Sequence, residues 1–249
     1  MQINNLIPGI FNYCDRWCER CFYSNKCLVF QKESEQKIKH ILKDEDPDDP
    51  AIFAQDIADN FREAFETLNQ MMEGMDDKID LDEDDDLDDD FDKIMEPNME
   101  MFDLHSKSNE FFNECSIFIK KIEAHFPKQN NEFIHENKEQ KLLAEVVAVL
   151  SWYSPQILVK CKRANFSLKE INLAVDEEMR GYANEDLNVS LKIAYLGIQK
   201  CLQVLRDLYN QMNEFSDEII TLLVIGNDTE KELLKLFPEI PNYKRPYFD

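Results

Sequence analysis

The sequence predicts an all-α protein: an antiparallel bundle of about five to six long helices with an N-terminal cysteine-rich segment. Apolar residues recur at three- and four-residue steps over several long segments, which is typical of helices that bury one face. No segment of similar length alternates apolar and polar residues as a strand does. The 249 residues include only five glycines and nine prolines, so we expect long elements and short connections.

The first two predicted helices lie on either side of a run of breaking residues. One helix covers 28–42 and ends before the Asp- and Pro-rich stretch 44–50. Asp49 is then placed to cap a second helix that has Pro50 at its first position. This helix runs to about Met75, and we expect its apolar stripe to face other helices: Phe53, Ile57, Phe61, Phe65, Leu68, Met72 and Met75.

Four more helices are predicted in the second half of the chain. The third runs from Pro97 to about 126 and the fourth over 132–165, with a kink expected before Pro155. The fifth has a regular stripe over 191–212. The sixth begins with Ser216 as its N-cap and ends by Phe237. Such amphipathic helices bury their stripes by packing together as a bundle.

The same pattern divides the chain into five regions. Residues 1–43 form a cysteine-rich segment and helix packed on the bundle, and 44–75 a bundle helix. Residues 76–96 form an acidic flexible linker, 97–237 the main bundle, and 238–249 an extended tail that we expect to pack across it.

Four of the seven cysteines lie within fourteen residues, in the pattern Cys14-x3-Cys18-x2-Cys21-x5-Cys27. Thiolates are soft ligands that suit zinc and iron–sulfur clusters, and these four are close enough in sequence to surround one centre. Zinc sites more often use two Cys-x2-Cys pairs, whereas only one is present here. The predicted cofactor is therefore a [4Fe–4S] cluster or zinc, with iron–sulfur slightly favoured.

The residues between these cysteines are compatible with such a centre. Arg16, Arg20 and Lys26 supply positive charge that lowers thiolate pKa values and offsets the charge of four sulfurs. Trp17 is one of several aromatic residues that could screen the centre from water.

Two other interpretations of the cysteines stay open. Phe11, Cys14, Cys18 and Cys21 also follow the spacing of one helical stripe, in which reduced cysteines are small core residues. Disulfides are disfavoured because the first residues lack the basic and long apolar regions of a secretory signal.

Parts of the motif resemble known iron–sulfur sites. Cys14-x3-Cys18-x2-Cys21 resembles the cluster triad of radical-SAM enzymes. Cys18-x2-Cys21-Phe22-x4-Cys27 is similar to part of the iron–sulfur staple of certain helical-insert nucleases. The first family uses a barrel of strands and the second a sheet-borne carboxylate and lysine site, so neither activity is transferred to this helical chain.

A broader resemblance involves three stretches, Tyr13–Cys21, Trp152–Ala164 and Lys244–Asp249. Together they resemble an uncharacterised family of bacterial helical proteins that has no known activity. The resemblance implies a helical architecture and a bacterial, cytoplasmic protein, but no chemistry.

The net charge of −23 argues against nucleic acid as a partner, because it repels phosphate. Residues 73–92 carry thirteen acidic residues and one lysine, which is typical of a solvated linker. A docking segment for a basic protein partner is a second interpretation of this block. A calcium-binding EF-hand loop is a weaker one, because Asp85 occupies the glycine position and Phe91 the glutamate position.

Other catalytic or binding patterns are incomplete. Glu132-x-x-His135 is half of a di-iron helical motif and has no second copy, and the five glycines are isolated, so no phosphate-binding loop is formed. We expect Cys115, Cys161 and Cys201 to be core residues. The longest apolar run, 142–153, is short for a membrane span, so no membrane role is expected.

These observations predict an intracellular helical protein whose Cys14, Cys18, Cys21 and Cys27 bind metal in a structural, binding or regulatory role. A catalytic role is not favoured. The alternatives are a [4Fe–4S] redox protein or enzyme, and a helical scaffold without metal. The process, the oligomeric state and any substrate are not determined by this sequence.

Overall fold

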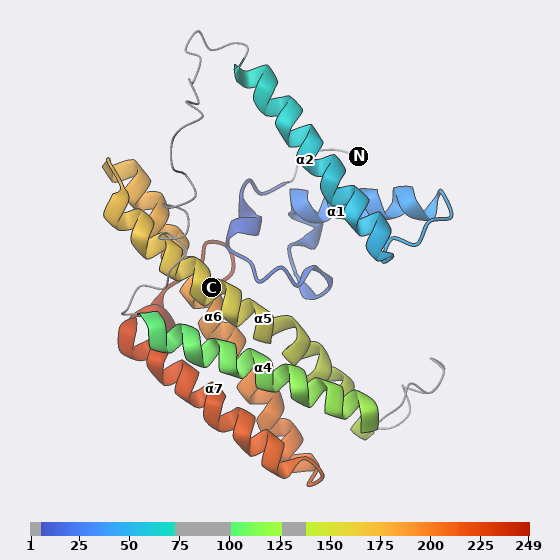
Figure 1. Cartoon of the computed structure of the whole chain (residues 1–249), viewed down its shortest axis with the longest axis vertical. Helices are drawn as coiled ribbons and strands as arrows, with labels where there is room; N and C mark the ends of the chain where they lie inside the picture. The colour runs from blue at the N-terminus through green and yellow to red at the C-terminus, as the bar shows by residue number, and fades with distance from the viewer. Residues whose placement is uncertain (1–5, 73–100, 126–137) are drawn as a thin grey trace, which may run out of the picture. The chain divides into compact units, whose positions relative to one another are not determined.

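The computed structural model describes residues 6–72, 101–125 and 138–249, and every structural statement below concerns these residues. They contain six α-helices and no β-strand, which confirms the all-α prediction (Figure 1). The chain divides into two units that are described separately. The first comprises residues 1–12 and 18–88, and the second residues 13–17 and 89–249.

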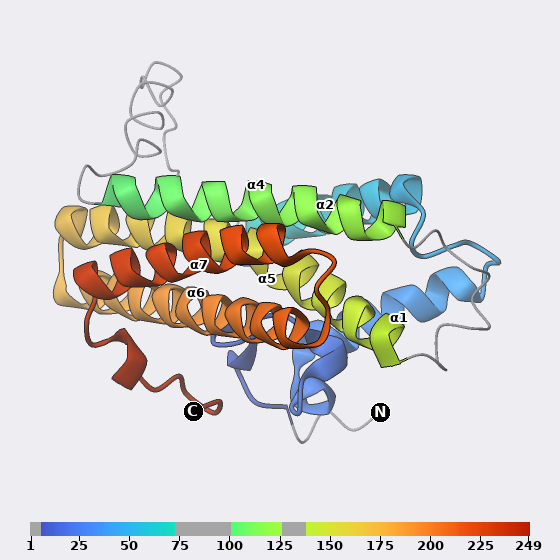
Figure 2. The same ribbon diagram turned by 90° about the horizontal axis from the view of Figure 1, so that it is seen from below.

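The second unit is built on four α-helices. These are α4 (Phe102–His125), α5 (Lys138–Leu173), α6 (Glu177–Gln211) and α7 (Ser216–Leu236). The long α5 and α6 form an antiparallel hairpin; α4 packs on α5 and α7, and α7 also packs on α6 (Figure 2). The core between them is apolar, and its largest fully buried side chains include Tyr153, Phe111, Phe118, Met101, Leu150, Ile157, Ile198 and Leu202.

Two helix starts differ in how they are capped. α6 begins after Asp176, whose side chain accepts a 2.8 Å hydrogen bond from the Met179 amide. α7 was predicted to have Ser216 as its N-cap, but Ser216 is its first helical residue and Phe215 is the cap. Phe215 is buried with its ring centroid 5.8 Å from that of Phe118. Burial of this aromatic ring outweighs the preference for a polar cap.

α5 continues beyond the predicted end near 165 to Leu173, with Pro155 inside it. By length and composition alone, α5 is apolar enough to cross a membrane. The apolar run 142–153 within this helix, on which the sequence prediction was based, is by itself too short for a membrane span. Core helices of soluble proteins meet the same criterion, and α5 lines the core with eleven buried residues.

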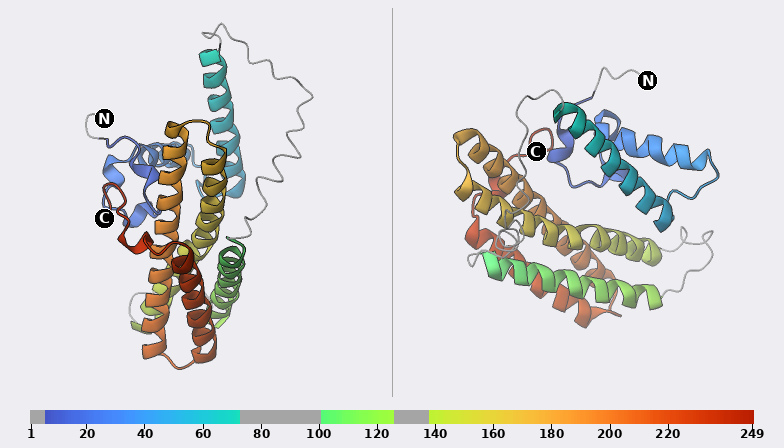
Figure 3. Two further views of the ribbon diagram at one scale, coloured as in Figure 1. Left: turned by 90° about the vertical axis from the view of Figure 1, so that its left-hand side faces the viewer. Right: turned by 45° about the horizontal axis from the view of Figure 1, so that its top comes forward.

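The C-terminal tail packs against α6, as expected (Figure 3). It contains a short 3-10 helix at Ile240–Asn242 and buries Ile240. Lys192 of α6 donates hydrogen bonds to the carbonyls of Pro241 at 2.8 Å and Ile240 at 3.4 Å. These bonds satisfy carbonyls at a turn that lies over the bundle.

The first unit contains a loop of short 3-10 helices, followed by α1 (Leu28–Ile41) and α2 (Pro50–Met72). As predicted, Asp49 caps α2: its Oδ1 accepts a 2.7 Å hydrogen bond from the Ala51 amide. His40 bridges the two helices, with Nδ1 2.7 Å from Glu45 Oε2 and Nε2 3.0 Å from Asp56 Oδ1.

Little is buried in the first unit. Of its described residues only Ile10 and Cys27 are buried, and neither α1 nor the described side chains of α2 include a buried one. The predicted apolar stripe of α2 exists over Phe53–Leu68, yet its five described members are 41 to 66% exposed; Met72 and Met75 lie outside the described side chains. A place for α2 within the bundle stays a prediction. The proposed acidic linker, the EF-hand interpretation and Glu132-x-x-His135 lie outside the described residues.

Candidate metal centre and its anchoring segment

Three of the four clustered cysteines lie at consecutive tight turns of the first unit. The Cys21 amide donates to the Cys18 carbonyl at 3.2 Å, Ser24 to Cys21 at 3.4 Å, and Cys27 to Ser24 at 3.2 Å. Cys27 is then the N-cap of α1. The alternative interpretation placed Phe11, Cys14, Cys18 and Cys21 on one α-helical stripe. Residues 11–21 instead form short 3-10 helices and bends, so these four residues do not share an α-helix.

All seven cysteines are described, and none is joined to another by a disulfide. Cys27 is buried, whereas Cys18 and Cys21 are partly exposed. The Tyr23 amide donates a 3.4 Å hydrogen bond to Cys21 Sγ. Backbone donors directed at sulfur are among the interactions by which proteins tune metal-bound cysteines.

Cys14 belongs to the segment Tyr13–Trp17 of the second unit and is buried. Lys160 of α5 is close enough to Cys14 to interact with it electrostatically. Burial lowers the pKa of Lys160, while charge on Asp186 and on a Cys14 thiolate acts in the opposite direction.

Asp15 fixes this segment to α5 and α6. The Tyr153 hydroxyl donates to Asp15 Oδ2 at 2.5 Å, and the Lys200 ammonium lies 3.5 Å from the same oxygen. The Asp15 carbonyl accepts from Trp152 Nε1 at 3.0 Å and Gln156 Nε2 at 2.5 Å. Burial alone would raise the pKa of Asp15. The Tyr153 hydrogen bond and the Lys200 charge outweigh it, so the pKa is lowered.

Aromatic rings cover the same anchor. The Trp17 ring stacks on Trp152 with centroids 5.5 Å apart and meets the Tyr153 ring edge-on at the same separation. Arg16, between Asp15 and Trp17, has a φ of 60°. A non-glycine residue in this left-handed region costs about 1–2 kcal/mol, which the contacts on both sides of it offset.

The C-terminal tail holds the other end of the segment. Arg245 Nη1 donates to the Tyr13 carbonyl at 3.3 Å, and Arg245 is itself held by a two-bond pair with Asp249 at 2.8 and 3.0 Å. The Tyr13 hydroxyl donates to Glu185 Oε1 at 2.8 Å, and this bond raises the pKa of Tyr13 to about 12.

The three remaining cysteines are core residues, as predicted. Cys115, Cys161 and Cys201 are buried in the bundle. Burial raises the pKa of all three thiols, that of Cys161 to about 12. Neutral, inaccessible thiols are poor nucleophiles and poor ligands.

A groove of about 500 Å³ lies at the α5–α6 connection. Its floor is apolar, and two of its charged groups pair: Arg163 Nε is 2.6 Å from Asp186 Oδ2, which also accepts a hydrogen bond from the Ser167 hydroxyl. Ser167 is fully buried and does not line the groove, so its hydroxyl is not presented to a molecule bound there.

The sequence singled out the four cysteines but missed the anchor. Neither Asp15 nor Lys200 belongs to a recognisable sequence motif. The available signals were that Asp15 lies close to aromatic residues in the sequence and that Lys200 lies beside core positions of α6. Among the described residues, no group of three or more histidine, cysteine or carboxylate side chains is arranged to hold a metal ion. The case for a metal at the four thiols therefore rests on the chemistry of the donor set.

Comparisons with protein-family models, with curated proteins and with solved structures found no match to this chain.

Proposed function

We propose that this chain is a helical protein of the bacterial cytoplasm whose N-terminal segment binds one metal centre through Cys14, Cys18, Cys21 and Cys27. The centre is an iron–sulfur cluster or zinc, with iron–sulfur favoured by the single Cys-x2-Cys pair. Its role is structural or regulatory rather than catalytic.

The proposal rests on the four-cysteine donor set, and the structural observation that supports it is the small buried core of the first unit. Only Ile10 and Cys27 are buried among the described residues of the first unit. A segment that buries so little apolar surface needs another source of stability, and small folds commonly obtain it from disulfides or a metal. Four cysteines within fourteen residues are a donor set that suits a metal, which is the source of stability proposed here.

Two further observations support the donor set. The Tyr23 amide donates a hydrogen bond to Cys21 Sγ, and Lys160 interacts electrostatically with Cys14. Binding would then be coupled to ordering of the loop, because a metal that binds the folded form stabilises it.

The test is metal analysis of protein purified without oxygen. We expect about one zinc ion or one cluster per chain, and loss of that metal in each single Cys→Ser variant at positions 14, 18, 21 and 27. Cys201→Ala is the matched control, since it removes a thiol of the bundle core and leaves the metal content unchanged. Metal-free parent protein, or full metal in the Cys→Ser variants, would refute the proposal.

A [4Fe–4S] redox protein is the second candidate, favoured by the spacing of the first three cysteines. It predicts a brown protein with broad visible absorption that is bleached by dithionite and restored by mild oxidation. A colourless protein with stoichiometric zinc excludes it and leaves the structural role.

A further inference from the structure

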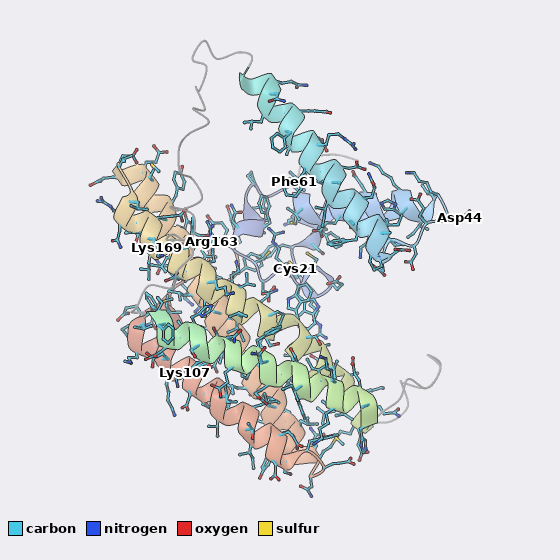
Figure 4. The ribbon with its side chains drawn as sticks, viewed as in Figure 1. Cys21, Asp44, Phe61, Lys107, Arg163 and Lys169 are labelled. Atoms are coloured by element: carbon cyan, nitrogen blue, oxygen red, sulfur yellow. The ribbon has the colours of Figure 1, made fainter. Side chains whose placement is uncertain are left out.

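Within the first unit, the stripe of α2 is an apolar surface that no described residue of that unit covers. Its members are Phe53, Ile57, Phe61, Phe65 and Leu68, each 41 to 66% exposed. Figure 4 labels Phe61 on this helix. The stripe covers sixteen residues, about 22 Å at 1.5 Å per residue. Three phenylalanines in one continuous stripe on a soluble protein indicate an interaction surface.

The charges around this stripe indicate what covers it. α2 carries four carboxylates and one guanidinium, and its last turn contains no basic residue. The C-terminal carbonyls of a helix add partial negative charge at that end. In the sequence, α2 leads directly into 73–92, with thirteen acidic residues against one lysine. In the sequence, the C-terminal half of the stripe is therefore followed by a concentration of negative charge, and the described part of α2 is itself net acidic.

This charge disfavours two other occupants. A second copy would bring another chain of net charge −23 against the first. A membrane surface is disfavoured because helices that lie on membranes carry lysine and arginine on the polar face, whereas α2 has only Arg62, and that residue pairs with Asp59.

We propose that α2 is the docking helix for a partner protein that presents an amphipathic helix rich in lysine or arginine. The partner's apolar residues pack on Phe61 and Phe65, and its cations pair with the exposed carboxylates of α2, Glu63 and Glu66. This is helix-to-helix recognition through i, i+3 and i+4 contacts, with electrostatic attraction increasing the association rate. The inference does not depend on the metal centre.

The probe is a synthetic peptide of leucine and lysine, about 18 residues long, with leucines on one helical face. A peptide with the same leucines and glutamate in place of lysine is its counterpart. We expect the lysine peptide to bind the full chain at one per chain, measured by fluorescence anisotropy, and more weakly as salt is raised. The glutamate peptide should not bind.

The decisive variant is the double change Phe61→Ser and Phe65→Ser, which should weaken binding of the lysine peptide about tenfold or more. The matched control, Asn60→Ser with Gln70→Ser, changes two exposed polar residues of α2 and should bind as the parent does. Helicity, metal content and the unfolding midpoint should be the same in all three proteins, because these side chains are exposed.

Four outcomes would overturn the proposal. Equal binding of the peptide by the phenylalanine variant would mean that charge alone acts. If the parent protein does not bind the lysine peptide, a basic amphipathic helix is not the partner of α2. If the parent is a dimer and the phenylalanine variant is a monomer, the stripe binds a second copy of the chain. If the variant unfolds at a lower midpoint than the parent, the stripe makes a contact within the chain.

Discussion

The hydroxyl of Tyr153 donates a 2.5 Å hydrogen bond to the carboxylate of Asp15, which lies 138 residues away in the sequence. Lys200 donates to the same hydroxyl. This three-residue arrangement joins the segment that carries Cys14 to the two longest helices of the bundle. The Arg245–Tyr13 hydrogen bond ties the same segment to the C-terminal tail.

Replacing Asp15 with asparagine should destabilise the bundle by about 1–3 kcal/mol, because it weakens a partly buried hydrogen bond to a charged group. The measurement is urea unfolding followed by circular dichroism. Tyr153→Phe removes the same bond from the other side. In a double-mutant cycle the two losses should therefore be strongly non-additive. Additive losses would mean that the pair contributes no coupling energy.

The stability that Asp15 contributes should depend on pH in the acid range. Its folded pKa is below its ordinary value, so the contribution is fully present above the unfolded pKa near 3.9 and is lost as pH falls through the folded pKa. The difference in unfolding free energy between parent and Asp15→Asn should be constant above about pH 5 and shrink below pH 4. A difference that persists undiminished at the lowest pH would contradict the assignment.

His40 and His105 should titrate on opposite sides of the ordinary histidine pKa near 6.5. Hydrogen bonds to Glu45 and Asp56 raise the pKa of His40, whereas burial lowers that of His105. The stability that His40 contributes to the α1–α2 joint is present below the unfolded pKa and is lost as pH rises through the folded one. Proton NMR of the imidazole ring signals measures the pKa of each histidine. Glu45→Gln should lower the pKa of His40 and leave that of His105 unchanged.

Two glycines on different helices should respond in opposite directions to alanine. At Gly226 a Cβ would lie 2.8 Å from Leu202 Cδ2 and 3.0 Å from Phe111 Cε2, so Gly226→Ala should cost about 1–3 kcal/mol by overpacking. At Gly181 nothing lies within 4 Å, so Gly181→Ala should stabilise α6 by about 0.5–1 kcal/mol. Thermal unfolding of both variants checks the pair, and equal shifts in one direction would contradict the packing described around α7.

Cysteine alkylation should separate the thiols by location. In metal-free native protein Cys18 and Cys21, which are partly exposed, should be modified by iodoacetamide first. Cys115, Cys161 and Cys201 should be modified only when the bundle unfolds, because burial keeps them neutral and inaccessible. Mass spectrometry of the peptides gives the order. Early modification of Cys161 would show that the α4–α5 contact opens readily.

The sequence by itself determined the helices of the bundle and the core cysteines, because local periodicity reports which face of a helix is apolar. It located the start of α2 through Asp49, since a cap is a local hydrogen bond. It also identified Cys14, Cys18, Cys21 and Cys27 as a donor set by their spacing, and that set stays a prediction.

Only the tertiary structure decided which of these features meet. The pairing of Asp15 with Tyr153 and of Tyr13 with Arg245 depends on how α5, α6 and the tail pack, and no local pattern encodes a contact across 138 or 232 residues. The cap of α7 moved to Phe215 because burial against Phe118 is a tertiary gain. The stripe of α2 was visible in the sequence, but its exposure was not, because periodicity shows that a face is apolar and not whether a partner covers it.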